Sequence, residues 1–311
     1  MTGSRTRQPL RLMETFRSVF YTPIYVSVAG GFLEGEGLDV EFSTCPPQYP
    51  HPLSALNRGV ADIGASGIMR SIIACDWGAE TVPLHLAKIN ARDGFFVLGR
   101  KPEAEFRWED FTGATVIPVG FTPMPWASFR YALRNHDIDP DQIDLIPDLS
   151  LVDAVAAFQQ GRGDFIHLPE PAAEQVLASG DAHLAVALGK ANGHIAYSSF
   201  AATNSFLAAK PEVALRFVQG YAKALDWLSS HEAPEVGGAV QQFFPGVEPE
   251  SIVRSVARYQ DQGTWPGEPS LNEPEYQGLQ DIIMAAGMVK ERQPYAKVVN
   301  PEIVRQALGD R

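Results

Sequence analysis

The spacing of apolar residues along this chain switches repeatedly between two periods. Gly37–Phe42 alternates apolar and polar residues, as a half-buried strand does, whereas Val213, Phe217, Val218, Tyr221, Leu225 and Leu228 recur with helical spacing after Pro211. Strands are predicted at 10–14, 37–42, 82–87, 94–99, 114–119, 143–147, 183–188 and 194–202, and after Asp62 and Asp164. Helices are predicted at 25–33, 53–57, 68–77, 126–135, 151–159, 172–179, 234–243, 249–259 and 273–286, and from Pro211. This alternation indicates an α/β protein whose C-terminal third is mostly helical and packs against one lobe.

A similar phrase occurs twice, at Arg58–Gly64 and at Gln160–Ile166. In each copy a predicted helix ends, Gly makes the turn, Asp follows three residues later, and a short apolar strand begins. Gly after a helix suits the left-handed conformation of a helix end. Two matching units predict two similar lobes, each presenting a loop at the carboxyl end of a strand, where ligands of α/β sheets bind. The alternative is that the two copies resemble each other by coincidence, because the phrase is short.

Composition narrows the class of protein. The chain has 311 residues, 45% hydrophobic and 20% charged, enough for a large core and two domains. A net charge of −12 disfavours nucleic acid as a partner. The apolar stretch Val19–Leu33 is too short and interrupted for a membrane span.

The chain shows no motif for a metal or a cofactor. Cys45 and Cys75 form no C-x-x-C motif, and the seven histidines show no paired metal spacing. Phosphate-loop, zincin and G-x-S-x-G signatures are missing from the sequence. We therefore expect neither a metal nor a cofactor, and no complete catalytic motif is found.

The loops that follow the predicted strands hold the candidate binding residues. Glu170 lies between two prolines that restrict its backbone, and its carboxylate suits a cationic or amide-bearing ligand; the alternative is a Glu that stabilises a helix start. Ser66, between Ala65 and Gly67, suits a polar or anionic ligand, or is a plain helix cap. The other candidates are loop residues and aromatic rings that could stack on a planar ligand or belong to the core: Gly120, Phe121, Thr122, Phe16 and Tyr21.

The order of several short motifs resembles a known family. The motifs are Gly31–Glu41, Leu56–Gly64, Trp108–Gly113, Ala154–Asp164, Pro169-Glu170-Pro171 and Lys210–Val213. Over roughly residues 10–228 the chain resembles the periplasmic-binding-protein-like proteins of the nitrate/sulfonate/taurine and thiamine-precursor (SsuA/THI5-like) group. Each motif is weak alone, and their joint order carries the resemblance.

The resemblance implies a type II periplasmic-binding-protein-like fold, with two α/β lobes, a cleft between them and extra C-terminal helices. Residues 10–94 would begin lobe 1, residues 95–198 would form lobe 2, and residues 199–311 would return to lobe 1 and add the helices. Carried over onto matching positions, the ligand-binding residues would be Ser66, Gly120, Thr122, Glu170 and Tyr197, with Asn90 at the first crossover.

Two functions follow from the resemblance. One is a solute-binding protein of an ABC-type importer, which binds a sulfonate, an aromatic acid or a pyrimidine-like compound and has a permease as its candidate partner. The other is a cytoplasmic desulfinase-, decarboxylase- or pyrimidine-synthase-like enzyme, with Glu170, His167 and Cys45 as candidate groups and Arg70 or Lys88 as anion partners. The family implies a periplasmic location, but we read no export signal, so a cytoplasmic location stays an alternative.

Overall fold

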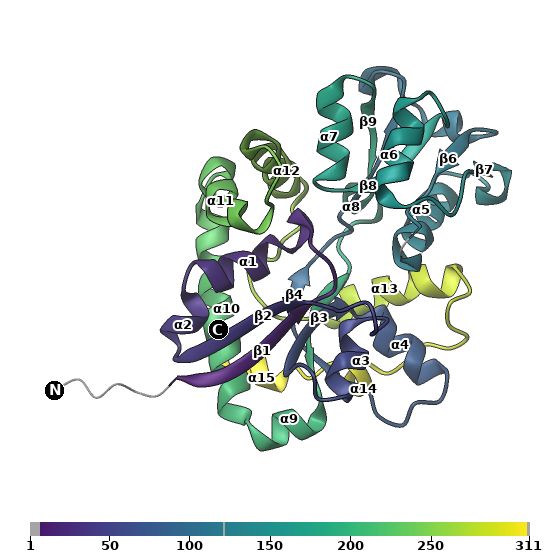
Figure 1. Ribbon diagram of the computed structural model, residues 1–311. Helices are drawn as coiled ribbons and strands as arrows, with labels where there is room; N and C mark the ends of the chain where they lie inside the picture. Colours follow the sequence, from purple (N-terminus) through teal and green to yellow (C-terminus); the bar gives the residue numbers. More distant parts are fainter. Residues whose placement is uncertain (1–6, 121, 310–311) are drawn as a thin grey trace.

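Two five-stranded sheets organise the protein, one in each lobe (Figure 1). The computed structural model describes residues 7–120 and 122–309. In lobe 1 the strand order is β2-β1-β3-β10-β4, and in lobe 2 it is β7-β6-β8-β5-β9. The lobe 1 strands are β1 (Gln8–Glu14), β2 (Leu38–Thr44), β3 (Ile63–Gly67), β4 (Leu84–Asn90) and β10 (Ser198–Ala202). The lobe 2 strands are β5 (Phe95–Gly99), β6 (Thr115–Ile117), β7 (Asp144–Leu145), β8 (Phe165–Pro169) and β9 (His183–Ala187).

Helices cover both sheets. Those between the strands are α1 (Thr22–Ala29), α2 (Phe32–Gly35), α3 (Pro52–Asn57), α4 (Met69–Asp76), α5 (Pro123–Asn135), α6 (Leu151–Gln159), α7 (Ala172–Ser179) and α8 (Leu188–Asn192). After β10 come α9 (Asn204–Ala209), α10 (Pro211–Ser230), α11 (Ala233–Val240), α12 (Pro249–Gln262), α13 (Glu273–Ala285), α14 (Tyr295–Val298) and α15 (Glu302–Leu308). Short 3₁₀ turns lie at Val19–Tyr21, Glu103–Glu105, Trp108–Phe111, Pro140–Gln142 and Gln241–Phe243. Within residues 7–120 and 122–309, every helix is too short or too polar to cross a bilayer.

The two sheets have the same topology. In lobe 1, β1 is parallel to β2 and β3, and β10 is antiparallel to β3 and β4. In lobe 2, β6 is parallel to β7 and β8, and β5 is antiparallel to β8 and β9. Each antiparallel strand is the one that enters its sheet directly from the other lobe. The prediction of two similar α/β lobes is therefore confirmed.

The repeated phrase has the same structure in both copies. Gly59 and Gly161 adopt positive φ angles of 68° and 89°, which glycine adopts without a steric cost. The Asp62 backbone N–H donates to Arg11 O at 2.9 Å, and its carboxylate accepts from the Arg11 backbone N–H at 2.9 Å. Asp164 makes the equivalent pair of bonds to Thr115. The phrase therefore fixes a helix end and attaches it to the first parallel strand of its own lobe.

Two crossover segments connect the lobes and are bonded to each other. The first runs from β4 to β5 and the second from α8 to β10. The Ile195 N–H donates to Ala91 O at 2.9 Å, and the Tyr197 N–H donates to Asn90 O at 3.3 Å. A third segment follows α12, where Thr264 O accepts from the Ala91 N–H at 2.8 Å. The boundaries 10–94, 95–198 and 199–311 stay a prediction, although they fall at these segments.

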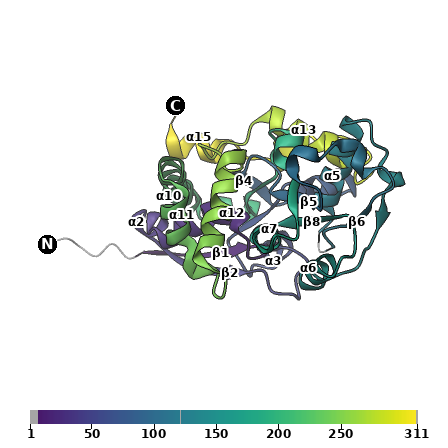
Figure 2. The same ribbon diagram turned by 90° about the horizontal axis from the view of Figure 1, so that it is seen from above.

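The C-terminal helices contact both lobes, so the prediction that they pack against one lobe is wrong. Helix α10 packs on α1 and α2 of lobe 1, whereas α12 contacts α7 and α13 contacts α5, both of lobe 2. Figure 2 shows α13 alongside α5, and the Arg134 guanidinium on α5 donates to Ala285 O at 2.7 Å. These contacts depend on residues distant in sequence, which local periodicity does not reveal.

Several predicted elements have different bounds in the structure, and three of them differ in the part that approaches the other lobe or breaks a helix. The helix predicted over 25–33 is two helices, because the chain turns at Gly31, whose φ is 72°. The strand predicted over 82–87 is β4, which begins two residues later and extends to Asn90. In the segment predicted to be extended over 194–202, the strand begins only at Ser198.

Candidate functional site

A small cavity lies between the lobes at the crossovers. It has a volume of about 40 Å³ and is lined from lobe 1, from lobe 2 and from the second crossover. Its aromatic lining residues are Phe16, Phe20, Tyr21, Phe95 and Tyr197. Its other lining residues are Thr15, Gly67, Met69, Arg70, Thr122, Met124 and Ser198. None of these described lining residues carries a carboxylate.

The aromatic wall is centred on Phe20. Its ring centroid lies 5.4 Å from that of Tyr21, 5.4 Å from that of Tyr197 and 6.3 Å from that of Phe95. Edge and tilted arrangements at such distances are the favoured geometries of aromatic pairs. A Cβ atom on Gly94 would lie 2.1 Å from the Phe20 ring, so only glycine permits this approach. The first crossover therefore determines the position of the ring that forms the wall.

Arg70 brings a positive charge to this cavity. It lies in the first turn of α4, directly after the β3 loop, and is half-buried. Burial lowers the pKa of Arg70, and Tyr21 and Cys45 are the groups that oppose this shift. Within the described ranges, no Asp or Glu pairs with this guanidinium. A guanidinium stays charged at neutral pH, so Arg70 offers its donors to an incoming acceptor.

Tyr197 presents a second polar group. Its side chain is 6% exposed, and its hydroxyl has no hydrogen-bond partner in the part of the chain that the structure describes. Burial raises the pKa of Tyr197 well above its ordinary value, so the hydroxyl keeps its proton. A buried hydroxyl without a partner costs free energy, which a ligand oxygen could recover.

Lobe 2 contributes the N-terminus of α5. Thr122 is the N-cap residue, and its side chain makes no cap hydrogen bond. Pro123 and Pro125 lie at the first and third helical positions, where proline has no N–H. Two of the four free N–H groups of an ordinary helix start are therefore missing. The donors available to an anion in this cavity come mainly from side chains.

Four of the nine predicted binding residues line the cavity: Phe16, Tyr21, Thr122 and Tyr197. Gly120 instead lines a neighbouring hollow of about 380 Å³ in lobe 2, together with Thr122 and Trp126. Phe121 lies outside the described residues.

Ser66 and Asn90 lie close to the cavity without lining it. Ser66 is fully buried on β3, and its hydroxyl has no partner among residues 7–120 and 122–309. It does not cap α4, whose N-cap residue is Ile68. The Asn90 side chain donates to Phe20 O at 2.7 Å and accepts from the Ser198 hydroxyl. Asn90 therefore connects the aromatic wall to the second crossover.

Glu170 is also buried, and its carboxylate already has protein partners. It is ion-paired with Arg258 of α12, and it accepts from the Glu174 backbone N–H at 2.8 Å and from the Ser255 hydroxyl at 3.2 Å. Burial raises the pKa of Glu170, while Arg258 opposes this shift. In this arrangement the carboxylate holds α12 against lobe 2 and does not face the cavity. The prediction that the Glu170 carboxylate binds a ligand did not include Arg258, which is distant in the sequence.

Phe20 and Phe95 were not among the predicted binding residues, and Arg70 was predicted only as an anion partner of the enzyme alternative. Phe20 belongs to the aromatic cluster after β1, and Arg70 lies three residues after Gly67, so both had a weak signal. Phe95 lies in an apolar strand, so its sequence context predicts a core residue.

The candidate catalytic groups are dispersed. Burial raises the pKa of Cys45, which favours the thiol over the reactive thiolate. His51 caps α3 through a hydrogen bond from the Ser54 N–H, and burial together with Arg70 lowers its pKa to about 4. His167 is buried against Phe95 and Phe129, and burial lowers its pKa to about 3.

The candidate anion partner Lys88 is also engaged. Its ammonium donates to Glu275 at 2.6 Å, and both side chains are largely buried. Between residues 7 and 309, leaving out 121, no cluster of three or more His, Cys, Asp or Glu is arranged to hold a metal ion.

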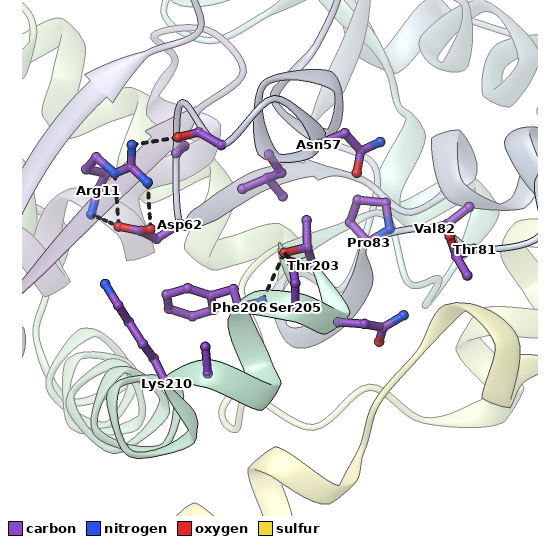
Figure 3. Close-up of a pocket in the computed structure, with 15 residues that line it drawn as sticks. Arg11, Asn57, Asp62, Thr81, Val82, Pro83, Thr203, Ser205, Phe206 and Lys210 are labelled. Carbon is purple, nitrogen blue, oxygen red and sulfur yellow. Dashed lines mark hydrogen bonds and ion pairs between the residues drawn. The ribbon is translucent and has the colours of Figure 1, made fainter.

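A larger hollow of about 670 Å³ lies at the other end of the lobe 1 sheet (Figure 3). Its labelled charges include Arg11 and Asp62, which bond to each other, and the Arg11 guanidinium also donates to Gly59 O at 2.7 Å. Lys210 extends toward this pair. Because the hollow touches only lobe 1 and its main charges are paired, we place the candidate site in the interlobe cavity.

Comparison with known proteins agrees with this architecture. The family described as "NMT1/THI5 like" matches residues 19–235. "Putative binding protein YtlA" of Bacillus subtilis (strain 168) is 31% identical over 98% of this chain and 92% of its own length.

Two solved structures show a similar fold. The ligand-binding component of an ABC-type import system from Staphylococcus aureus aligns with a TM-score of 0.75 and 15% identity, over 97% of this chain and 99% of that one. The alkanesulfonate-binding protein SsuA from Xanthomonas axonopodis pv. citri, bound to MOPS, aligns with a TM-score of 0.72 and 18% identity, over 96% and 100%. The expected periplasmic-binding-protein-like fold is confirmed, and the chain belongs to the NMT1/THI5-like family.

Proposed function

We propose that this protein is the solute-binding component of an ABC-type importer and binds a small organic anion between its two lobes. The anionic group lies in the interlobe cavity, where it accepts hydrogen bonds from Arg70 and Tyr197. The carbon skeleton next to this group contacts the aromatic wall around Phe20. A permease is the expected protein partner, and the location is the periplasmic or extracytoplasmic side of the membrane.

The proposal rests mainly on the burial of Arg70 and on its lack of a carboxylate partner among the described residues. A half-buried guanidinium without a carboxylate partner among the described residues is expensive, because burial disfavours its charge. Such a cost is tolerated where a ligand supplies the opposite charge. A sulfonate or carboxylate suits the planar fork of Arg, and the Tyr197 hydroxyl adds a donor to the same group. The name of the Xanthomonas protein, a binder of alkanesulfonates, points to the same class of ligand.

Hinge motion between the lobes would admit and enclose the ligand. The chain crosses between the lobes at two bonded segments, and the cavity is lined from both lobes. In this scheme Phe16, Tyr21, Thr122 and Tyr197 contact the ligand, while Asn90 and Glu170 hold the crossovers and α12 in place. Ser66 lies on β3 beside the lining residue Gly67, and Gly120 lies on the loop that precedes α5.

Calorimetric titration tests this function. The purified protein is titrated with alkanesulfonates, arylsulfonates and aromatic carboxylates, and with neutral amides of the same skeletons. We expect the anions to bind and the amides to bind far more weakly. Arg70→Met should weaken anion binding roughly tenfold to 150-fold, which corresponds to about 1.5–3 kcal/mol for a hydrogen bond to a charged group.

Arg58→Met is the matched control. Arg58 is exposed and lines none of the hollows described above, so its loss should leave affinity unchanged. Equal weakening by both substitutions would mean that general electrostatic attraction, and not the cleft, holds the anion. Recovery of a chemically altered ligand would contradict a pure binding function.

A further inference from the structure

The interlobe cavity is too small for a whole organic ligand. At about 40 Å³ it admits a group of only a few atoms, whereas binding pockets for small molecules usually measure roughly 300–1,000 Å³. A charged headgroup fills such a space. The remainder of any larger ligand must therefore lie elsewhere.

A second hollow adjoins the cavity at Arg70. It has a volume of about 530 Å³, and it shares Arg70 and Met69 with the inner cavity. Its walls come from α4, from Pro123 at the start of α5 in lobe 2, and from the loop after α13 at Gly287 and Met288. We call this hollow the vestibule. It spans the two lobes, as the inner cavity does.

The vestibule presents a continuous apolar strip. Arg70, Ile73 and Ala74 of α4 and the C-cap residue Trp77 recur at helical spacing and therefore share one face. Trp77 is 80% exposed, which is unusual for a large apolar ring, and Met288 of the loop after α13 lines the same hollow. No carboxylate lines the vestibule among the described residues. His51 at its edge has a pKa of about 4, because burial and Arg70 lower it, so the imidazole is neutral at neutral pH.

We infer that the vestibule is a second subsite, which receives the apolar tail of the same ligand. The ligand is then an amphipathic anion, with its headgroup beside Arg70 and Tyr197 and an alkyl or aryl tail along α4 to Trp77 and Met288. This inference rests on the proposed function. The occupant is the tail of the ligand because Arg70, which holds its charge, lines both hollows.

Titration with n-alkanesulfonates, from methanesulfonate to octanesulfonate, tests the subsite. Once the headgroup fills the inner cavity, each further methylene enters the vestibule. We expect binding to tighten about fourfold per added methylene until the tail reaches Trp77, as burial of one CH₂ group implies.

Variants separate the subsite from the site of the charge. Trp77→Ala and Met288→Ala should weaken octanesulfonate binding at least tenfold and leave ethanesulfonate binding unchanged. Ala74→Phe should block the strip and give the same selective loss by a different route. Val152→Ala on α6 is the control, because Val152 is 78% exposed and lies outside both hollows.

The outcomes distinguish the two proposals. Tight binding of short sulfonates that does not improve with chain length would overturn the subsite and leave the proposed function intact. The same holds if Trp77→Ala and Ala74→Phe leave the chain-length dependence unchanged. Failure of every sulfonate and carboxylate to bind would overturn both.

Discussion

Asp164 holds the backbone of Thr115 through two hydrogen bonds. Its own N–H donates to Thr115 O at 2.8 Å, and its carboxylate accepts from the Thr115 N–H at 2.8 Å. Asp62 and Arg11 form the same ring in the other lobe, and the Arg11 guanidinium adds further bonds to the Asp62 carboxylate. Asp in the repeated phrase therefore joins a helix end to β1 in lobe 1 and to β6 in lobe 2.

Asp62→Ala should lower the free energy of unfolding by about 1–3 kcal/mol, because it leaves the Arg11 backbone N–H without its partner. Asp164→Ala should have a smaller effect, since its bond to Thr115 is more exposed. Urea unfolding at neutral pH measures both. Asp39→Ala is the control, because Asp39 is exposed on β2 and makes no ion pair with the described residues. An Asp62→Ala effect as small as that of Asp39→Ala would show that the ring contributes little.

Tyr197→Phe should weaken binding of the proposed anion roughly tenfold without lowering stability. The Tyr197 hydroxyl has no partner in the described part of the protein, so its removal leaves nothing unsatisfied in the unliganded state. Tyr221→Phe is the opposite case, because that hydroxyl donates to Lys88 O at 2.7 Å and is remote from the ligand. It should cost about 1 kcal/mol of stability and leave affinity unchanged. Calorimetry measures the affinity of both variants, and urea unfolding measures their stability. A loss of stability in Tyr197→Phe would argue against a ligand-facing hydroxyl.

Arg258→Met should destabilise the protein by about 3–5 kcal/mol, because it leaves the buried Glu170 carboxylate without its cation. Adding Glu170→Gln should recover part of the loss. Arg254→Met is the matched control, since this half-exposed Arg pairs with Glu174 alone and should cost less than about 1 kcal/mol. Urea unfolding of the four proteins completes the comparison. If the double variant is no more stable than Arg258→Met, an unpaired carboxylate is not the source of the cost.

His167→Leu should make the protein less sensitive to acid. Burial lowers the folded-state pKa of His167 to about 3, below its ordinary value of 6.5. Its contribution to stability is therefore fully present above about pH 6.5 and is lost as the pH falls toward 3, because the unfolded state gains a proton first. Between about pH 7.5 and 5, the variant should lose about 2 kcal/mol less stability than the parent protein.

Urea unfolding at both pH values checks the His167 prediction, with the exposed His183→Leu as the control. His85 and His51 are also held with lowered pKa values by burial, so part of the acid sensitivity should persist in His167→Leu. An unchanged pH dependence would mean that His167 gains its proton in the folded state.

The sequence predicted those features that depend on neighbouring residues. Gly59 and Gly161, each with Asp three residues later, predicted two equivalent helix–strand units. This was possible because the end of a helix and the start of a strand depend on neighbouring residues. Glu170 was expected to face a ligand because its carboxylate looked free beside two prolines. Its partner Arg258 lies 88 residues away, and no local pattern connects them. Arg70 was named only as an anion partner of the enzyme alternative, because the lack of a paired carboxylate is a property of the folded chain and cannot be read from the sequence.

The prolines at the start of α5 affect which anions can compete for the cleft. Inorganic sulfate and phosphate are commonly held by several backbone N–H groups at a helix start, and Pro123 and Pro125 remove two of them here. Such fully hydrated ions gain too little from one guanidinium and one hydroxyl to offset the loss of their water. An organic anion gains in addition from contact between its carbon atoms and the aromatic wall. The cleft can thus stay available to a scarce organic solute in a medium rich in mineral salts.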